Sequence, residues 1–133
     1  MGRDNKGIIK AINRGEKKIM LKRKCNNWCF HADVEAEVTA PGVSRKVLAF
    51  CDEAMAVENT FEVGAIGSMH SHPHTQITYV AKGVFKFTIG EETRIVKAGD
   101  TLLKQDGIIH GCECMEEGIL VDFFTPMRED FIK

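Results

Sequence analysis

The chain has 133 residues, 44% of them hydrophobic and 28% charged, and its formal net charge is −1. This length and composition suit one compact globular domain and exclude wholesale disorder and the collagen-like and coiled-coil classes. No apolar run approaches the roughly 20 residues that span a bilayer, and the N-terminus has no secretory signal pattern, so we expect a cytoplasmic protein.

The first 24 residues differ from the rest in charge. They hold nine of the 18 basic residues and two of the 19 acidic residues, a net charge of +7, which leaves nine basic and 17 acidic residues, a net charge of −8. We predict a basic N-terminal extension over residues 1–24 and a single domain over residues 25–133. Because the extension has no aromatic residue and no nucleic-acid-binding motif, a solvated or docked arm is favoured over nucleic-acid binding.

Two further features lie within this extension. Ile8, Ile9 and Ile12 have helical spacing, which predicts one short helix. The segment Arg14-Gly15-Glu16 can be encoded by a purine-rich ribosome-binding sequence, so Met20 is an alternative start of the natural product.

The domain that follows reads as short strands. Between residues 26 and 40 the pattern is mixed, and its expected core contacts are Trp28, Phe30, Val34 and Val38. After the Pro41-Gly42 turn, apolar and β-branched segments alternate with Gly-bearing turns. The expected strands cover residues 44–50, 54–63, 76–81, 84–89 and 93–97, and another follows Gly118. This order predicts an all-β antiparallel sandwich or barrel.

The cysteines indicate reduced thiols rather than a disulfide framework. Their number is odd, and the chain has no secretory signal; they are Cys25, Cys29, Cys51, Cys112 and Cys114. The run Cys25-x3-Cys29-x-His31 is a weak alternative for a second metal site, and packed thiols are favoured over it. Cys112 and Cys114 share one face of an expected strand, either lining the barrel near a metal or simply packing there.

Histidines carry the strongest chemical signal. In an extended strand His70 and His72 point to the same side about 7 Å apart, close enough to hold one metal ion. His110 follows two Gly-bearing turns that can bring it beside this pair, and Gln76 offers a carbonyl oxygen as a fourth ligand. These ligands suit one divalent transition metal per subunit, such as zinc, nickel, iron, manganese or cobalt. His74 follows Pro73 and is expected at the mouth of the barrel. There it is either a metal ligand, a residue that contacts a ligand, or a surface residue.

Two stretches around these histidines resemble the two motifs of the cupin family. Residues 64–83, GAIGSMHSHPHTQITYVAKG, match the first motif, with Gln76 where the family usually has Glu. Residues 99–114 match the second, with Gln105 in place of Pro and Cys114 in place of Asn. The resemblance implies an all-β double-stranded β-helix, the cupin jelly-roll barrel, with a metal held by His70, His72, Gln76 and His110.

The C-terminal segment narrows this resemblance. From about Gly42 onward, the segments SRKVLA, HSHPHTQITYV and TPMREDF are similar to the KdgF-type subgroup of single-domain cupins. Characterised members of that subgroup open the ring of 4,5-unsaturated monouronates from pectin or alginate and give a linear keto sugar acid. The resemblance implies the same ring-opening or isomerase activity here, with Asp122, Phe124 and Arg128 where the subgroup contacts its substrate.

These residue types suit that chemistry. Asp122 can act as a general acid/base and Arg128 can pair with a substrate carboxylate, while the resemblance implies that Phe124 contacts the substrate. The structural alternatives are a hydrogen-bond acceptor for Asp122, core packing for Phe124 and an ion pair with Glu129 or Asp130 for Arg128.

Two other functions compete with the ring-opening enzyme. The first is a metal-dependent oxygenase, because three-histidine cupin sites also serve oxygen chemistry. The second is a non-catalytic cupin that binds a small ligand. In each case the expected partners are a small molecule, a sugar acid in the favoured case, and a second copy of the chain, because a homodimer covers the exposed sheet edge of so small a barrel.

Overall fold

The computed structural model describes residues 7–13 and 18–132, and it confirms an all-β domain. Two short 3-10 turns, η1 (His31–Asp33) and η2 (Glu129–Phe131), accompany the strands. The strands are β1 (Gly7–Asn13), β2 (Lys18–Lys24), β3 (Glu37–Ala40), β4 (Val43–Cys51), β5 (Ala54–Phe61), β6 (Ile66–His70), β7 (Thr75–Ile89), β8 (Glu92–Lys97), β9 (Thr101–Lys104) and β10 (His110–Thr125). No helix in the described ranges is long and apolar enough to cross a membrane.

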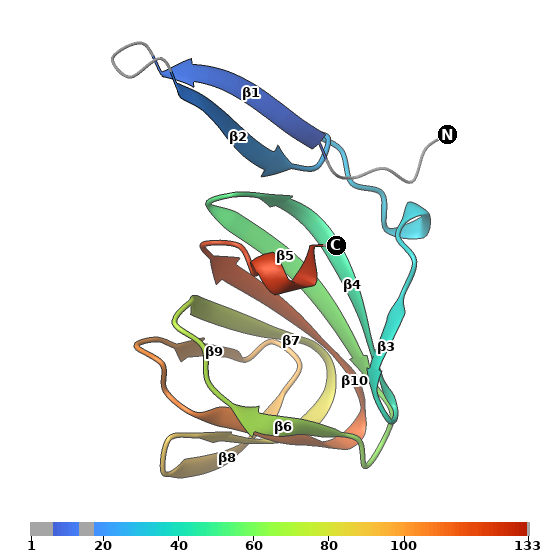
Figure 1. The fold of residues 1–133 in the computed structure, drawn as a ribbon. Coiled ribbons are helices and arrows are strands. Elements are labelled where there is room, and N and C mark those ends of the chain that lie inside the picture. Colours follow the sequence, from blue (N-terminus) through green and yellow to red (C-terminus); the bar gives the residue numbers. More distant parts are fainter. Residues whose placement is uncertain (1–6, 14–17, 133) are drawn as a thin grey trace.

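All strand pairs in the described residues are antiparallel, and β10 lies between β5 and β7 in the sheet order β1-β2-β4-β5-β10-β7-β8. It pairs with β5, β6 and β7, while β3 joins β4 and β9 joins β7. Figure 1 shows how strands β3 to β10 curve into a barrel, with the hairpin of β1 and β2 outside it and the turn η2 lying over the end of the barrel near β5. The predicted double-stranded β-helix is therefore confirmed, and β10 brings both halves of the barrel together.

Strand β7 runs through the position where we expected a turn. The sequence placed a turn at Lys82-Gly83 between two strands, but β7 is continuous from Thr75 to Ile89. Gly83 has φ +86°, and a Cβ on it would lie 2.5 Å from the backbone oxygen of Glu117. The pairing register of β10 also shifts opposite this point. The glycine thus permits a close backbone approach at an irregularity inside a long strand pair.

Two expectations for the N-terminal part are wrong. Ile8, Ile9 and Ile12 lie in strand β1, paired with β2, rather than in a helix; isoleucine is β-branched and favours strands. Trp28 and Val38 are 75% and 80% exposed and Phe30 is 60% exposed, so they are not core contacts, and Val34 is half-buried. Trp28, Phe30 and Val34 precede the short β3 and Val38 lies within it, and an apolar residue need not be buried.

Two apolar clusters fill the barrel. In the first, the rings of Phe61 and Phe85 meet edge to face with centroids 5.2 Å apart. Its other members are Val43, Ala65, Val80, Phe87, Cys114 and Leu120. The second cluster contains Cys25, Phe50, Met55, Val57, Phe124 and Met127. Edge-to-face aromatic packing and complete burial make Phe85 a principal contributor to stability.

A band of polar side chains crosses the interior among these apolar residues. Five strands contribute to it at positions where the alternation of side chains points inward. Its members, which we call the polar band, are Arg45 from β4, Asn59 from β5, Gln76 and Thr78 from β7, Lys104 from β9, and Asp122 from β10.

We expect the variant Phe85→Ala to lower the free energy of unfolding by about 3–5 kcal/mol, because it removes a fully buried ring from the first cluster. Urea unfolding followed by far-ultraviolet circular dichroism measures this change. The matched control is Ile95→Ala on β8, where the side chain is exposed and the change should stay within about 0.5 kcal/mol. Equal losses in the two variants would contradict this assignment of the core.

Candidate metal centre

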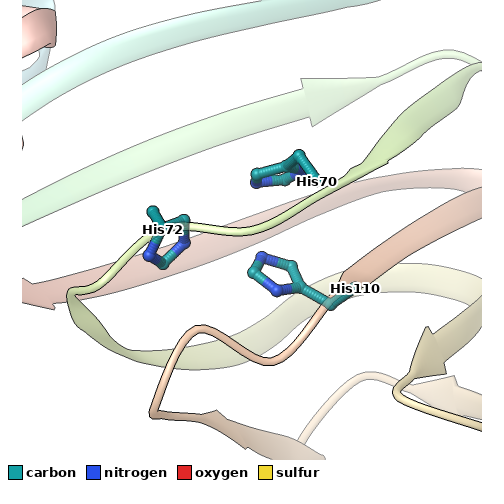
Figure 2. A group of neighbouring side chains, drawn as sticks. All are labelled: His70, His72 and His110. Atoms are coloured by element: carbon teal, nitrogen blue, oxygen red, sulfur yellow. The ribbon is translucent and has the colours of Figure 1, made fainter.

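Three histidines from separate segments meet in space. His70 ends β6, His72 lies in the loop after it, and His110 begins β10 (Figure 2). The ring centroids of His70 and His110 are 4.4 Å apart, those of His72 and His110 5.1 Å, and those of His70 and His72 5.6 Å. One nitrogen from each ring lies within 4.8 Å of the others. The expected grouping of these three side chains is confirmed.

The backbone that carries His72 differs from the expectation. We placed His70 and His72 on one extended strand, but β6 ends at His70. His72 precedes Pro73, which has no N–H to offer a strand ladder. The loop instead returns the chain toward β7, and the ring of His72 still turns toward the other two (Figure 2).

Backbone carbonyl groups fix the tautomers of two of the rings. The Nδ1 atoms of His70 and His110 lie 2.8 and 3.0 Å from the carbonyl oxygens of Ser68 and Ile108. A carbonyl oxygen only accepts hydrogen bonds, so both Nδ1 atoms carry the proton and each Nε2 keeps a free lone pair. In proteins this second hydrogen bond is the usual support of a metal-bound histidine.

Burial favours the neutral form of two of the histidines. It lowers the pKa of His110 to about 4, against a weaker opposing effect from the bond to Ile108. The pKa of His72 is also lowered, chiefly by burial. Since the unperturbed pKa of histidine is about 6.5, both rings are neutral at pH 7, which is the state that binds a metal.

Gln76 joins this group through its amide oxygen. Its Oε1 lies 2.8 Å from Nε2 of His72, and its Nε2 donates a 2.8 Å hydrogen bond to Oδ1 of Asp122. Because Asp122 receives the amide N–H, the amide oxygen is turned toward the histidines. Gln76 therefore presents the atom that the sequence assigned to it as a ligand.

Asp122 is one of three side chains of the polar band that each make three side-chain hydrogen bonds, with Gln76 and Thr78. Its Oδ1 accepts hydrogen bonds from Gln76 and from the hydroxyl of Thr78, and its Oδ2 accepts one from Asn59 at 2.7 Å. The hydroxyl of Thr78 in turn accepts a hydrogen bond from Nζ of Lys104. A continuous chain of hydrogen bonds therefore runs from Lys104 through Asp122 to His72.

A cavity of about 340 Å³ opens beside the histidines. Its lining contains His70, Gln76 and His110 together with all three residues expected to contact substrate, Asp122, Phe124 and Arg128. The ring of Phe124 also packs against that of His72, with centroids 5.6 Å apart. This volume lies at the small end of the range for ligand sites, which suits a monosaccharide better than a longer chain.

Arg128 is held by a carboxylate and two aromatic rings. Its Nε and Nη2 donate to Oδ1 and Oδ2 of Asp130 at 3.0 and 2.8 Å, so the ion pair named as a structural alternative exists. This hydrogen bond is the main reason that the pKa of Asp130 is lowered from its ordinary value. The guanidinium also lies over Phe124 and Phe131. The fork to Asp130 uses two of its five N–H groups, which leaves others for a ligand.

The remaining candidates lie outside the three-histidine group. His74 packs its ring 5.4 Å from that of His72 and is half-buried, with an unpartnered buried Nδ1, but it is not one of the three clustered histidines. Among the described side chains, that cluster is the one group of three or more His, Cys, Asp or Glu suited to a metal, so Cys25, Cys29 and His31 form no second site. All five cysteines are free thiols, and burial raises the pKa of Cys112 to about 12.

Sequence reasoning missed four members of the polar band: Arg45, Asn59, Thr78 and Lys104. All of them except Thr78 line the cavity. A signal did exist, because Thr78 lies two residues after Gln76 and Lys104 lies two residues after Leu102 on the same side of its strand. Polar residues at inward-facing strand positions indicate a functional site, but they can be grouped only when the pairing of the strands is known.

The residues present fit a divalent metal. The Nε2 atom of His110 and the Nδ1 atom of His72 are both buried, and neither has a hydrogen-bond partner among the described residues. Unsatisfied buried nitrogens are costly and rare unless something binds them. Imidazole nitrogens and one amide oxygen form a ligand set that suits first-row transition metals.

Comparisons with known proteins agree with this geometry. A family model described as a cupin domain matches residues 57–124. The pectin degradation protein KdgF of Dickeya dadantii (strain 3937) is 42% identical over 98 residues, which cover 72% of this chain and 89% of that protein.

Two solved structures extend the similarity to three dimensions. An RmlC-like cupin from Shewanella frigidimarina matches with a TM-score of 0.79 and 36% identity, covering 82% of this chain and 98% of that one. KdgF from Halomonas sp. matches with a TM-score of 0.77 and 30% identity, covering 80% of this chain and 99% of that one.

We expect the wild-type protein to retain one divalent metal per chain after dialysis, and the variant His110→Ala to retain much less. Loss of a residue that hydrogen-bonds to a metal ligand weakens metal affinity roughly 10–100-fold. Loss of a metal ligand itself should weaken metal affinity by more than this. Elemental analysis of dialysed protein measures this content. The control His31→Ala removes an exposed histidine bound to Glu58, so a similar loss there would refute the assignment.

Proposed function

Because the chain belongs to the cupin domain family, we propose that it is a metal-dependent enzyme that opens the ring of 4,5-unsaturated monouronates from pectin or alginate. The similarity to KdgF proteins from two organisms supports this substrate class, since one of them is described as a pectin degradation protein. The observation that carries the proposal is the buried contact between Asp122 and Gln76, which joins a carboxylate to the histidine cluster inside a cavity of monosaccharide size.

The reaction requires proton transfer between two oxygens of the sugar. The C1 hydroxyl loses its proton, the bond between C1 and the ring oxygen breaks, and a C1 aldehyde forms. The ring oxygen takes the bonding electron pair and a proton and becomes an enol. The enol then becomes a ketone when its O–H proton is lost and C4 gains one, which gives a linear keto sugar acid.

Asp122 is the proposed carrier of the first proton. A carboxylate offers about four lone-pair positions, and three hydrogen bonds from protein donors occupy three of them. The fourth position can accept the C1 hydroxyl. Both reacting oxygens are bonded to C1, so one carboxylate can take the proton from the first and return it to the second.

Arg128 and Phe124 are the proposed substrate-binding groups. The N–H groups of Arg128 that Asp130 does not use can bind the carboxylate of the uronate. The Phe124 ring forms part of the cavity wall between this guanidinium and the histidines, and it packs against the sugar. Together they orient the acid group of the substrate with respect to Asp122.

The proposed ligands of one divalent metal are His70, His72, Gln76 and His110. When bound, such a metal supplies a Lewis acid that polarises a hydroxyl or carbonyl oxygen of the substrate. The ligand set suits zinc, nickel, iron, manganese or cobalt.

We expect metal-loaded protein to convert 4,5-unsaturated galacturonate and mannuronate, seen as loss of their ultraviolet absorbance, and His110→Ala to abolish this activity. Asp122→Asn should lower kcat by about 10²–10⁴-fold, because it removes the proton carrier. Arg128→Lys should mainly raise KM, because an ammonium cannot reproduce the planar fork. The matched control is Asp33→Asn, in the turn η1 outside the cavity.

The alternative functions have distinct outcomes. If metal-loaded protein turns over neither uronate, the ring-opening proposal is wrong. Oxygen uptake by iron-loaded protein with a small organic acid would then indicate an oxygenase, and ligand binding without any turnover would indicate a binding protein.

We also propose a homodimer formed through the outer face of the sheet. Phe123 on β10, Ile77 on β7 and Leu103 on β9 are paired in one row across the sheet, and all three are exposed. Tyr79 extends this apolar face in the neighbouring row. Such a row of large exposed apolar side chains is typical of an interface. A cytoplasmic location is consistent with the five free thiols.

We expect light scattering after size-exclusion chromatography to give the mass of a dimer for the wild type and of a monomer for Ile77→Asp, because the new charge would be buried at the interface. The control Ile95→Asp lies on β8 at an exposed position away from this row. A monomeric wild type, or a dimer that persists in Ile77→Asp, would rule out this interface.

A further inference from the structure

Lys104 is a buried lysine that none of the roles proposed so far uses. It is 1% exposed, yet its side chain lines the cavity beside His110 and Asp122. Its Nζ donates a hydrogen bond to the hydroxyl of Thr78 and lies 4.6 Å from the centroid of the Phe87 ring. An ammonium group has three donors, and the Thr78 hydroxyl takes one of them.

The three cationic side chains of the cavity differ in their direct partners. Arg45 donates to a carboxylate oxygen of Glu37, and Arg128 donates to both oxygens of Asp130. Among the described residues, Lys104 bonds to a hydroxyl and faces a ring, while Asp122 lies one hydrogen bond further away. Lys104 is therefore the cation of the cavity without a directly bonded carboxylate, and it is the one best able to bind a new negative charge.

The position of Lys104 conflicts with the local sequence pattern. In β9 the inward-facing residues are Leu102 and Lys104, and an inward position of a small barrel usually holds an apolar side chain. Burying an ammonium group is costly, because water no longer solvates the charge. A lysine kept at such a place, next to a ligand cavity, indicates a functional reason.

The neighbours of Lys104 place it between a proposed metal ligand and the proposed proton carrier. Its Cα pairs across β7 and β9 with that of Gln76, a proposed metal ligand. Its Nζ reaches Thr78, which also bonds to Asp122, the proposed proton carrier. A sugar bound between Asp122 and the histidines thus lies within the part of the cavity that Lys104 lines.

We propose that Lys104 is a catalytic residue that donates a hydrogen bond to the ring oxygen of the substrate as the bond from that oxygen to C1 breaks. This inference rests on the proposed ring opening and names the group that stabilises its leaving oxygen. The ring oxygen takes the bonding pair before it receives from Asp122 the proton that the C1 hydroxyl lost, so negative charge develops on it. A donor fixed in a buried site stabilises such a charge far more than water does.

The competing explanation is that Lys104 only neutralises Asp122 through Thr78. The two roles differ in what removal of the ammonium changes. A group that neutralises Asp122 would affect folding, metal content and ligand binding together. A donor to the leaving oxygen acts mainly in the transition state, so its loss lowers kcat and leaves KM nearly unchanged.

The test compares Lys104→Met with the wild type and with Lys86→Met, an exposed lysine on the same sheet. We expect Lys104→Met to lower kcat for the unsaturated uronates by about 10²–10³-fold, the usual loss for one such donor. We expect its KM, its metal content and its dissociation constant for D-galacturonate, measured by calorimetry, to stay within about threefold of wild type. Lys86→Met should match the wild type in all of these.

Chemical rescue provides a second measurement. In Lys104→Ala, added ethylammonium should restore part of kcat in a saturable manner, because it supplies a donor to the space left by the side chain. Ethanol of similar size, which is neutral, should not. A purely structural lysine would give the same response to both additives.

The outcomes separate this inference from the function on which it rests. If the wild type does not turn over the uronates, the proposed function fails and this role falls with it. If the wild type is active and Lys104→Met keeps a normal kcat, or loses galacturonate binding and metal in proportion to kcat, the ring-opening function stands and the role of Lys104 is overturned.

Discussion

The site depends on one buried carboxylate. Asp122 accepts hydrogen bonds from Asn59, Gln76 and Thr78, which come from the two strands that flank β10. These bonds turn the amide of Gln76 so that its oxygen faces His72. Without an acceptor at this position, the buried Gln76 and Thr78 and the part-buried Asn59 would each lose a partner, at a cost of roughly 1–3 kcal/mol for a buried donor left unpaired. The same side chain therefore organises the barrel interior and orients a proposed metal ligand.

The barrel supplies the surroundings in which this polar band can exist. Burial of the apolar clusters around Phe85 and around Met55 opposes the cost of enclosing Lys104 and Asp122. Backbone carbonyls of Ser68 and Ile108 take the Nδ1 protons of His70 and His110, so the main chain itself prepares two nitrogens for a metal. Long strands matter here, because β10 starts with His110 and carries both Asp122 and Phe124.

The sequence predicted which residues form the site better than it predicted the hydrogen bonds between them. Histidine spacing and the cupin motifs led to His70, His72 and His110, and the structure groups them. The roles of Asp122, Phe124 and Arg128 stay predictions, although all three line the cavity. The sequence did not indicate that Asp122 bonds to Gln76, because this contact joins residues that only the fold brings together. The ion pair of Arg128 with Asp130 was among the alternatives that the sequence offered.

The sequence by itself determined features that depend on local patterns or on a motif. These are an all-β chain, its Gly-bearing turns, and three histidines at metal-binding spacing. Where it failed, local patterns were ambiguous, as for Gly83 inside β7 and for the isoleucines of β1. The tertiary structure alone decided that Trp28 and Phe30 are exposed and that Lys104 is buried. Burial depends on which strands lie across from a residue, and pairs such as Gln76 with Lys104, or Asp122 with Thr78, form between segments that are distant in sequence.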